Sequence, residues 1–305
     1  IPLAFDLTPG NTNEQKTLLP LEKRIMRDFA LSKLVVCTDA GLSSKTNRSF
    51  NSFANRAYVT VQSLKKLKQH LRDWALDPQA WHLNGSSTVF NLNEIDLEDN
   101  TAVYTKERWI HENGLEERLI ISFSPKYKRY QETIRGRQIE RACHQIEVKA
   151  PARSAKNPND PARFIQELKT TPSGEVAQQR HLSLDLDKID NERQYDGFYG
   201  VVTNLEDDVQ TILRINQRRW EIEESFRIMK SEFKARPVYL QNEKRIEAHF
   251  LTCFMALTLF RILEKRLNET ISAETLIQTL REMDLHPIRA QGYIPLFKRT
   301  ALTDK

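Results

Sequence analysis

The chain has 305 residues, of which 39% are apolar and 29% charged, with only nine glycines. This composition excludes a disordered tail and allows one large globular domain or two. The longest largely apolar run, Phe250 to Phe260, stops at Arg261, which is too short to cross a bilayer, and no signal peptide opens the chain. The three cysteines, Cys37, Cys143 and Cys253, are odd in number and far apart. We therefore expect a reduced, cytoplasmic protein with no membrane partner.

The start of the chain predicts an open α/β arrangement. Ile1 to Phe5 alternates like a strand, and Thr12 to Ala30 is predicted as a helix opened by a capping box. Leu34 to Cys37 is a continuous apolar run, typical of a strand covered on both faces. Asp39 follows this strand, where open sheets bind ligands, and Gly41 permits close approach. Two roles stay open for Asp39: a cap of the next helix, or a functional carboxylate.

The segment from 87 to 203 has a different texture, because short predicted strands alternate with turn signals. Asn113-Gly114 between two such strands is a strong hairpin signal. A helix is predicted from about Tyr127 to Ile146. Lys126 to Lys156 holds nine lysines and arginines against three glutamates, so the excess charge of the chain is concentrated here. This charge indicates either a nucleic-acid backbone as partner or a solvated basic helix face.

The segment from Glu206 to Phe233 is predicted as a helix with a break near Asn216. At about 100° per residue, its apolar residues share one stripe, which we expect to be buried. These residues are Ile222, Phe226, Met229 and Phe233. A second stripe carries one carboxylate among cations: Asn216, Arg219, Glu223, Arg227 and Lys230. Ordinary ion pairs on a solvated helix face would produce the same pattern.

The last hundred residues are predicted to be helical. A long helix begins near Arg245, and we expect its His249 to pack against the core or another helix rather than to act in catalysis. A last helix is predicted from Thr275 to Met283, followed by an irregular tail.

The polar stripe also has a specific spacing. Arg219-x3-Glu223-x6-Lys230 resembles the Tyr-x2-Arg-x3-Glu-x6-Lys signature of DDE transposases of bacterial insertion sequences. Asn216 stands where this signature has its tyrosine, which is a departure from the pattern. The strand that ends in Asp39, followed by Gly41, similarly resembles the way this family presents its second catalytic aspartate.

The resemblance implies a fold and a chemistry. The fold is α/β, with a partial ribonuclease H-like catalytic core, a β-rich insertion domain and carboxyl-terminal helices. Residues 1–86 would be the first part of the core, 87–203 the insertion with the basic helix, and 204–305 the helical second part with the last catalytic glutamate. Asp39 and Glu223 would be metal ligands for Mg²⁺ or Mn²⁺, and Arg219 and Lys230 would hold phosphates beside them. Double-stranded DNA, at transposon ends and target, would be the partner.

Further expectations follow from the same resemblance. The chain would form a homodimer on DNA and act at the bacterial nucleoid. In the family, the first catalytic carboxylate precedes the segment matched here, and Asp6 is no substitute for it. We therefore expect an amino-terminally truncated transposase. Two alternatives remain: a catalytically silent DNA-binding remnant, and a nuclease on the same fold. If the basic segment contacts DNA, neutralising Lys126, Lys128 and Arg129 should flatten the salt dependence of binding.

Overall fold

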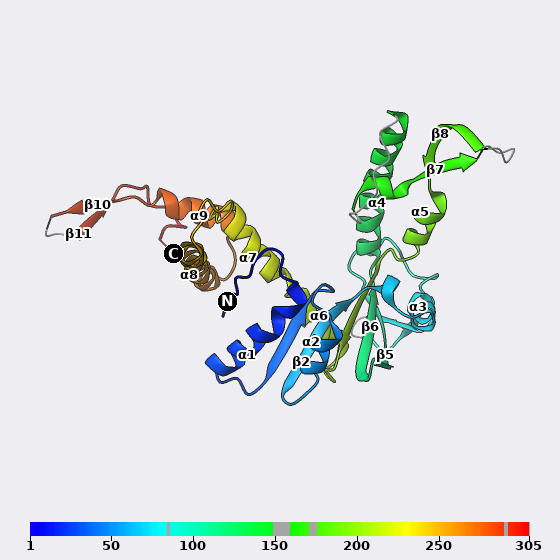
Figure 1. Ribbon diagram of the computed structural model, residues 1–305. Coiled ribbons are helices and arrows are strands. Elements are labelled where there is room, and N and C mark those ends of the chain that lie inside the picture. Colours follow the sequence, from blue (N-terminus) through cyan, green and yellow to red (C-terminus); the bar gives the residue numbers. More distant parts are fainter. Residues whose placement is uncertain (84–85, 149–158, 171–175, 290–291, 305) are drawn as a thin grey trace. The chain divides into compact units, whose positions relative to one another are not determined.

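The protein, described by a computed structural model at residues 1–83, 86–148, 159–170, 176–289 and 292–304, contains two compact units. One unit comprises Val35–Asn216 and is called the sheet unit. The other comprises Ile1–Leu34 together with Gln217–Lys305 and is called the helical unit. Figure 1 gives the labels of the elements, and each unit is described by itself.

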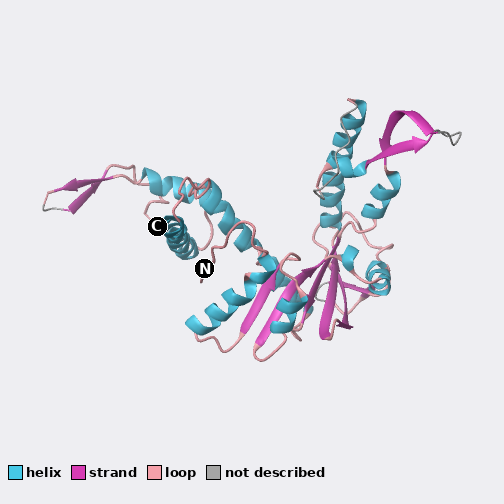
Figure 2. Cartoon of the chain, in the orientation of Figure 1, coloured by secondary structure: helices cyan, strands magenta, loops and turns pink. Residues whose placement is uncertain are grey.

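A seven-stranded sheet forms the framework of the sheet unit (Figure 2). Its strand order is β1 (Leu34–Thr38), β2 (Arg56–Gln62), β9 (Phe198–Thr203), β6 (Leu115–Phe123), β5 (Tyr104–Glu112), β3 (Trp81–Leu83) and β4 (Val89–Phe90). β9 pairs antiparallel with both β2 and β6, so strands from the middle of the chain continue the same sheet as β1 and β2. The boundaries at 86 and 203 stay a prediction.

Each face of this sheet carries an apolar cluster, because successive side chains of a strand point to opposite faces. On β6 and β9, Leu119, Ile121 and Val202 enter one apolar cluster, while Ile120 and Val201 enter another. α3 (Gln69–Leu76) covers the first cluster with Leu71 and Ala75, and α6 (Val209–Gln217) covers the second with Ile212 and Leu213. The predicted hairpin at Asn113-Gly114 joins β5 to β6, and both turn residues have the positive φ that this pair favours.

A long helix, α4 (Pro125–Glu147), confirms the helix predicted near 127–146 and packs with several further elements of the sheet unit. Its Ala142 packs with Phe164 and Ile189 in a small separate core. The neighbouring elements are η3 (Pro161–Phe164), β7 (Ile165–Thr170), β8 (Val176–Leu184) and α5 (Leu186–Arg193). Two further short elements are α2 (Lys45–Phe50) and η2 (Leu64–Lys66). The predicted loop prolines between 149 and 158 lie outside the described residues.

The helical unit is built on three helices, α7 (Trp220–Ser231), α8 (Glu243–Arg266) and α9 (Ala273–Glu282). Their shared core contains Ile228, Leu257, Phe260, Leu276 and Ile277. The unit also contains η1 (Glu14–Lys16), α1 (Leu18–Asp28), β10 (Leu285–Ile288) and β11 (Gly292–Pro295). His249 contacts the Ala235 carbonyl at 3.1 Å, which matches its expected packing role.

Two expectations from the sequence are wrong, and a third holds in part. Residues 1–5 form no strand: the Phe5 ring instead packs on Phe254, with centroids 4.9 Å apart. The tail after α9 is not irregular, because β10 and β11 pair as a hairpin. Of the apolar stripe predicted for α7, Met229 and Phe233 pack against the core around the fully buried Ile228, whereas Ile222 and Phe226 are 52% and 68% exposed. The buried face of α7 therefore departs from the predicted stripe in the first half of the helix.

One helix in the described part of the chain, α8, is long and apolar enough to cross a membrane by length and composition. Of its most apolar window, 22% is buried within the protein. The apolar run from Phe250 to Phe260 that the sequence shows is only part of this helix. A single such helix is weak support for a membrane span, because a core helix meets the same criteria.

Candidate active site

Asp39 lies directly after β1, at the end of the strand as predicted. Its backbone is fixed from the sheet: the buried Thr38 hydroxyl donates to Thr60 Oγ1 at 2.8 Å, and the Thr60 hydroxyl donates to the Asp39 carbonyl at 3.2 Å. Its Oδ1 accepts the backbone N–H groups of Gly41 and Leu42 at 2.9 and 3.1 Å. This is an Asx turn, which orients the carboxylate.

The alternative role of Asp39 as a helix cap does not apply to α2. The N-cap of α2 is Ser44, whose side chain accepts the N–H of Asn47 at 3.2 Å. Asp39 is exposed, and its Oδ2 makes no hydrogen bond with the described residues. One carboxylate oxygen is therefore positioned by the backbone, and the other is open to a ligand.

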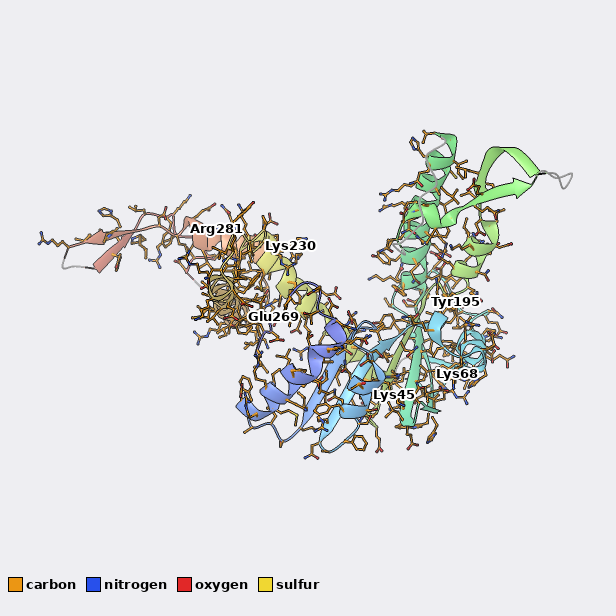
Figure 3. The ribbon with its side chains drawn as sticks, in the orientation of Figure 1. Lys45, Lys68, Tyr195, Lys230, Glu269 and Arg281 are labelled. Atoms are coloured by element: carbon orange, nitrogen blue, oxygen red, sulfur yellow. The ribbon has the colours of Figure 1, made fainter. Side chains whose placement is uncertain are left out.

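Glu223 lies in the first turn of α7, with 69% of its side chain exposed. Arg219, just before α7, places Nη1 3.5 Å from Glu223 Oε1, as an i, i+4 pair. Lys230 is exposed in the last turn of the same helix (Figure 3). The Arg219 Nε atom is buried and has no hydrogen-bond partner in the described part of the chain. Arg219, Glu223 and Lys230 therefore lie along one side of α7 and the residue before it.

Sequence reasoning missed the residue that orients α7. Arg261 on α8 is 8% exposed and donates to Glu224 Oε2 at 3.1 Å and to the Glu221 carbonyl at 3.1 Å. It also donates to Ser225 Oγ at 3.3 Å. Glu224 is thus occupied in a buried ion pair, whereas its neighbour Glu223 faces away. No local sequence signal indicates this contact, because 37 positions separate Glu224 from Arg261.

Asn216, at the tyrosine position of the signature, is buried at the end of α6. Its Nδ2 donates to the hydroxyl oxygen of Tyr199 on β9 at 3.2 Å, and its Oδ1 has no hydrogen-bond partner in the described residues. A phenol from another strand therefore lies beside the position where the signature has one. The sequence could not predict this pairing, because β9 is brought to α6 only by the sheet.

The two carboxylates suit a hard divalent cation. Mg²⁺ and Mn²⁺ prefer oxygen ligands, and both Asp39 and Glu223 are exposed carboxylates of this type. Within the described residues, no group of three or more His, Cys, Asp or Glu side chains is arranged to hold a metal ion. Asp39 belongs to the sheet unit and Glu223 to the helical unit.

Comparison with protein families identifies the class of this protein. The model of the Transposase DDE domain family matches residues 1–259, which is most of the chain and covers both units. The chain therefore belongs to the Transposase DDE domain family. Its mixed α/β architecture is consistent with the ribonuclease H-like fold of DDE transposases. Comparison with curated proteins gives no match. The family implies transposition chemistry with DNA as the partner.

Proposed function

We propose that this protein is a DDE transposase that cleaves DNA strands at the ends of an insertion sequence and transfers them to target DNA. A single observation supports this most strongly: within the family match, Asp39 and Glu223 each present an accessible carboxylate from a fixed backbone position. This activity would take place at the bacterial nucleoid, where its substrate lies.

Both steps replace one P–O bond by another. In cleavage, a water oxygen bonds to phosphorus, and the 3′-oxygen of the DNA leaves as a hydroxyl. In transfer, that 3′-hydroxyl oxygen bonds to a target phosphorus, and the 3′-oxygen of the target strand leaves and takes up the proton. A bound divalent cation would supply activation of the attacking oxygen and neutralise charge on the leaving oxygen. Asp39 and Glu223 would hold it.

The cations beside Glu223 would orient the DNA. Arg219 offers a planar fork that fits two phosphate oxygens, and Lys230 offers a flexible point charge. Arg219 is only 26% exposed and contacts Glu223, so its side chain has limited freedom, and its buried Nε has no hydrogen-bond partner among the described residues. Lys230 lies in the last turn of α7, within reach of a different phosphate.

Nicking of supercoiled plasmid in Mg²⁺ tests the proposal. Asp39→Ala and Glu223→Ala should each reduce nicking by at least about a hundredfold, since each removes a metal ligand. The matched controls are Asp187→Ala on α5 and Glu247→Ala on α8, which remove exposed carboxylates elsewhere in each unit. Nicking by the two site variants at the rate of their controls would refute the assignment.

A change of ligand chemistry tests metal contact directly. Asp39→Cys and Glu223→Cys replace a hard oxygen ligand by a softer thiolate, which binds Mg²⁺ poorly. Both variants should be inactive in Mg²⁺ and regain part of their nicking in Mn²⁺. A residue with a purely structural role would show the same loss with either cation.

Two other functions predict different outcomes. A catalytically silent DNA-binding remnant is favoured by the absence of a three-ligand cluster among the described residues. It predicts that wild type and both alanine variants bind DNA equally and that none nicks it. A nuclease on the same fold predicts nicking without strand transfer into a target plasmid.

A further inference from the structure

The long helix α4 has one face that is firmly attached to the protein. Arg135 is 8% exposed, and its guanidinium forms a two-pronged pair with Asp196, with Nη1 2.7 Å from Oδ1. Ala142, two turns further on, is fully buried against Phe164. Arg135 and Ala142 lie on the same side of the helix, because seven residues make nearly two full turns. This attachment fixes the rotation of α4 about its own axis.

The opposite face of α4 is exposed and carries three of its cations. At about 100° per residue, one stripe runs opposite Arg135 and Ala142. Its exposed members are Lys126, Tyr130, Thr133, Arg137, Glu140, Arg141, His144 and Glu147. Lys126, Arg137 and Arg141 make no ion pair within the described ranges, whereas the buried Arg135 does. Three cations of α4 that have no ion pair in the described ranges therefore lie on this face, together with the carboxylates Glu140 and Glu147.

These exposed cations differ from Lys126, Lys128 and Arg129, which the sequence indicates as DNA contacts. Arg129 is already occupied, because its guanidinium donates to the Leu97 carbonyl and to Asn100, and lies 3.7 Å from Glu98. Lys128 is only partly exposed and its Cβ faces Gly197. The basic residues of this segment between 149 and 156 lie outside the described residues. Of the three cations named from sequence, only Lys126 belongs to the exposed stripe.

The spacing of the stripe fits a DNA backbone. Arg137 and Arg141 are four residues apart, or ~6 Å along the axis, and Lys126 lies ~17 Å before Arg137. Each strand of duplex DNA presents a phosphate about every 3.4 Å along its axis. A row of cations over ~22 Å can therefore reach several phosphates of one strand, and the hydroxyl of Tyr130, which is 60% exposed, can donate to another.

Contacts between three tyrosine rings connect this face to Asn216. Tyr130 stacks on Tyr127 with ring centroids 6.3 Å apart, and Tyr127 meets the edge of Tyr199 at the same distance. Tyr199 accepts the hydrogen bond from Asn216, the residue that opens the signature. The amino-terminal end of the stripe is thus connected through these rings to Asn216 at the end of α6.

We propose that the exposed face of α4, formed by Lys126, Tyr130, Arg137, Arg141 and His144, binds the phosphate backbone of double-stranded DNA outside the catalytic residues. This inference rests on the proposed function, because it assigns a surface to the same substrate. The contact is independent of sequence, because it is made to phosphates and not to base edges.

The salt dependence of binding to a short duplex of arbitrary sequence tests this surface. The slope of log K against log salt is negative, and each lost phosphate contact makes it less steep by about 0.9. The triple variant Lys126→Ala, Arg137→Ala and Arg141→Ala should therefore make the slope less steep by about 2 to 3. The matched control is Lys45→Ala, Lys66→Ala and Lys188→Ala, which removes the same charge from exposed lysines elsewhere in the sheet unit. This control should retain the wild-type slope.

The outcomes separate this inference from the proposed function. A wild-type slope in the α4 variant, or an equal decrease in both triple variants, would overturn the assignment of the surface even if the protein nicks DNA. A selective decrease for the α4 variant supports the surface even if no nicking is seen in Mg²⁺ or Mn²⁺. Circular dichroism of both variants should match wild type, because all six side chains are exposed.

Discussion

At the scale of single residues, the sheet unit contains a fully buried carboxylate with two partners. Glu117 on β6 has no exposed surface, and Arg48 Nη1 lies 2.8 Å from both of its carboxylate oxygens. The Tyr58 hydroxyl donates to the same carboxylate. A buried carboxylate is tolerated only with such partners, since an unpaired charge would cost several kcal/mol. This network attaches α2 to the central strands.

The pKa of Tyr58 should make the protein sensitive to alkali. Burial raises this pKa above its ordinary value, and the hydrogen bond to Glu117 raises it further. The unfolded chain releases the proton near pH 10, whereas the folded protein keeps it. The contribution to stability is thus complete below that pH and is lost at higher pH by about 1.4 kcal/mol per pH unit. Tyr58→Phe should make the decline of melting temperature above pH ~10 shallower.

The control for this prediction is Tyr239→Phe, because Tyr239 is 89% exposed. Its melting temperature should follow the wild-type pH dependence. Equal slopes for Tyr58→Phe and wild type would show that Tyr58 titrates alike in the folded and unfolded chains. The comparison concerns slopes, because Tyr58→Phe also removes a hydrogen bond at every pH.

At the scale of elements, the packing of α7 on α8 decides which face of α7 is accessible. Arg261 contacts Glu221, Glu224 and Ser225, all in the first half of α7. Glu223 lies on the other side of this half, with most of its side chain exposed. Arg261 is therefore a positioning residue for the proposed metal ligand, and it acts by fixing the rotation of the helix.

Arg261→Lys should weaken catalysis more than folding. Lysine keeps the charge but loses the planar fork that holds three groups at once. Small misplacement of a reacting group lowers rates by up to about a hundredfold, so we expect nicking to fall ten- to hundredfold. The metal concentration for half-maximal nicking should rise, while DNA affinity stays unchanged. Arg266→Lys, exposed at the end of the same helix, is the control. A folded Arg261→Lys variant with wild-type nicking and metal dependence would contradict this role.

At the scale of the whole molecule, the family match spans both units, and the chain enters the sheet unit after Leu34 and leaves it after Asn216. The two proposed ligands, Asp39 and Glu223, therefore come from different units. Transfer of an insertion sequence also requires two ends to be held together. We propose that two copies of the chain provide this by forming a symmetric dimer on DNA.

Sedimentation measurements test this assembly. The protein should sediment as a dimer when saturated with a duplex carrying the element's end, with two duplexes bound per dimer. The triple variant of α4 should require a higher DNA concentration to reach the same state, because it loses phosphate contacts. A complex of one chain with one duplex at saturation would exclude the proposed dimer.

Much of the fold could be predicted from local patterns. β1 and α4 lie close to their expected positions, and the Asn113-Gly114 hairpin is confirmed. These features depend on periodicity, apolar runs and turn chemistry, which act over a few residues. The strand expected at residues 1–5 is wrong because a strand needs a hydrogen-bonded partner, which local alternation does not reveal.

The sequence by itself determined the family, through the spacing of Arg219, Glu223 and Lys230 and the match over residues 1–259. It also placed Asp39 after a strand, because strand ends follow from local composition. Only the tertiary structure decided which face of α7 is buried, which cations of α4 are free, and that Tyr199 meets Asn216. The physical reason is that these outcomes depend on contacts between residues far apart in the chain. A helix has one periodicity, but the partner that packs against it selects the buried face.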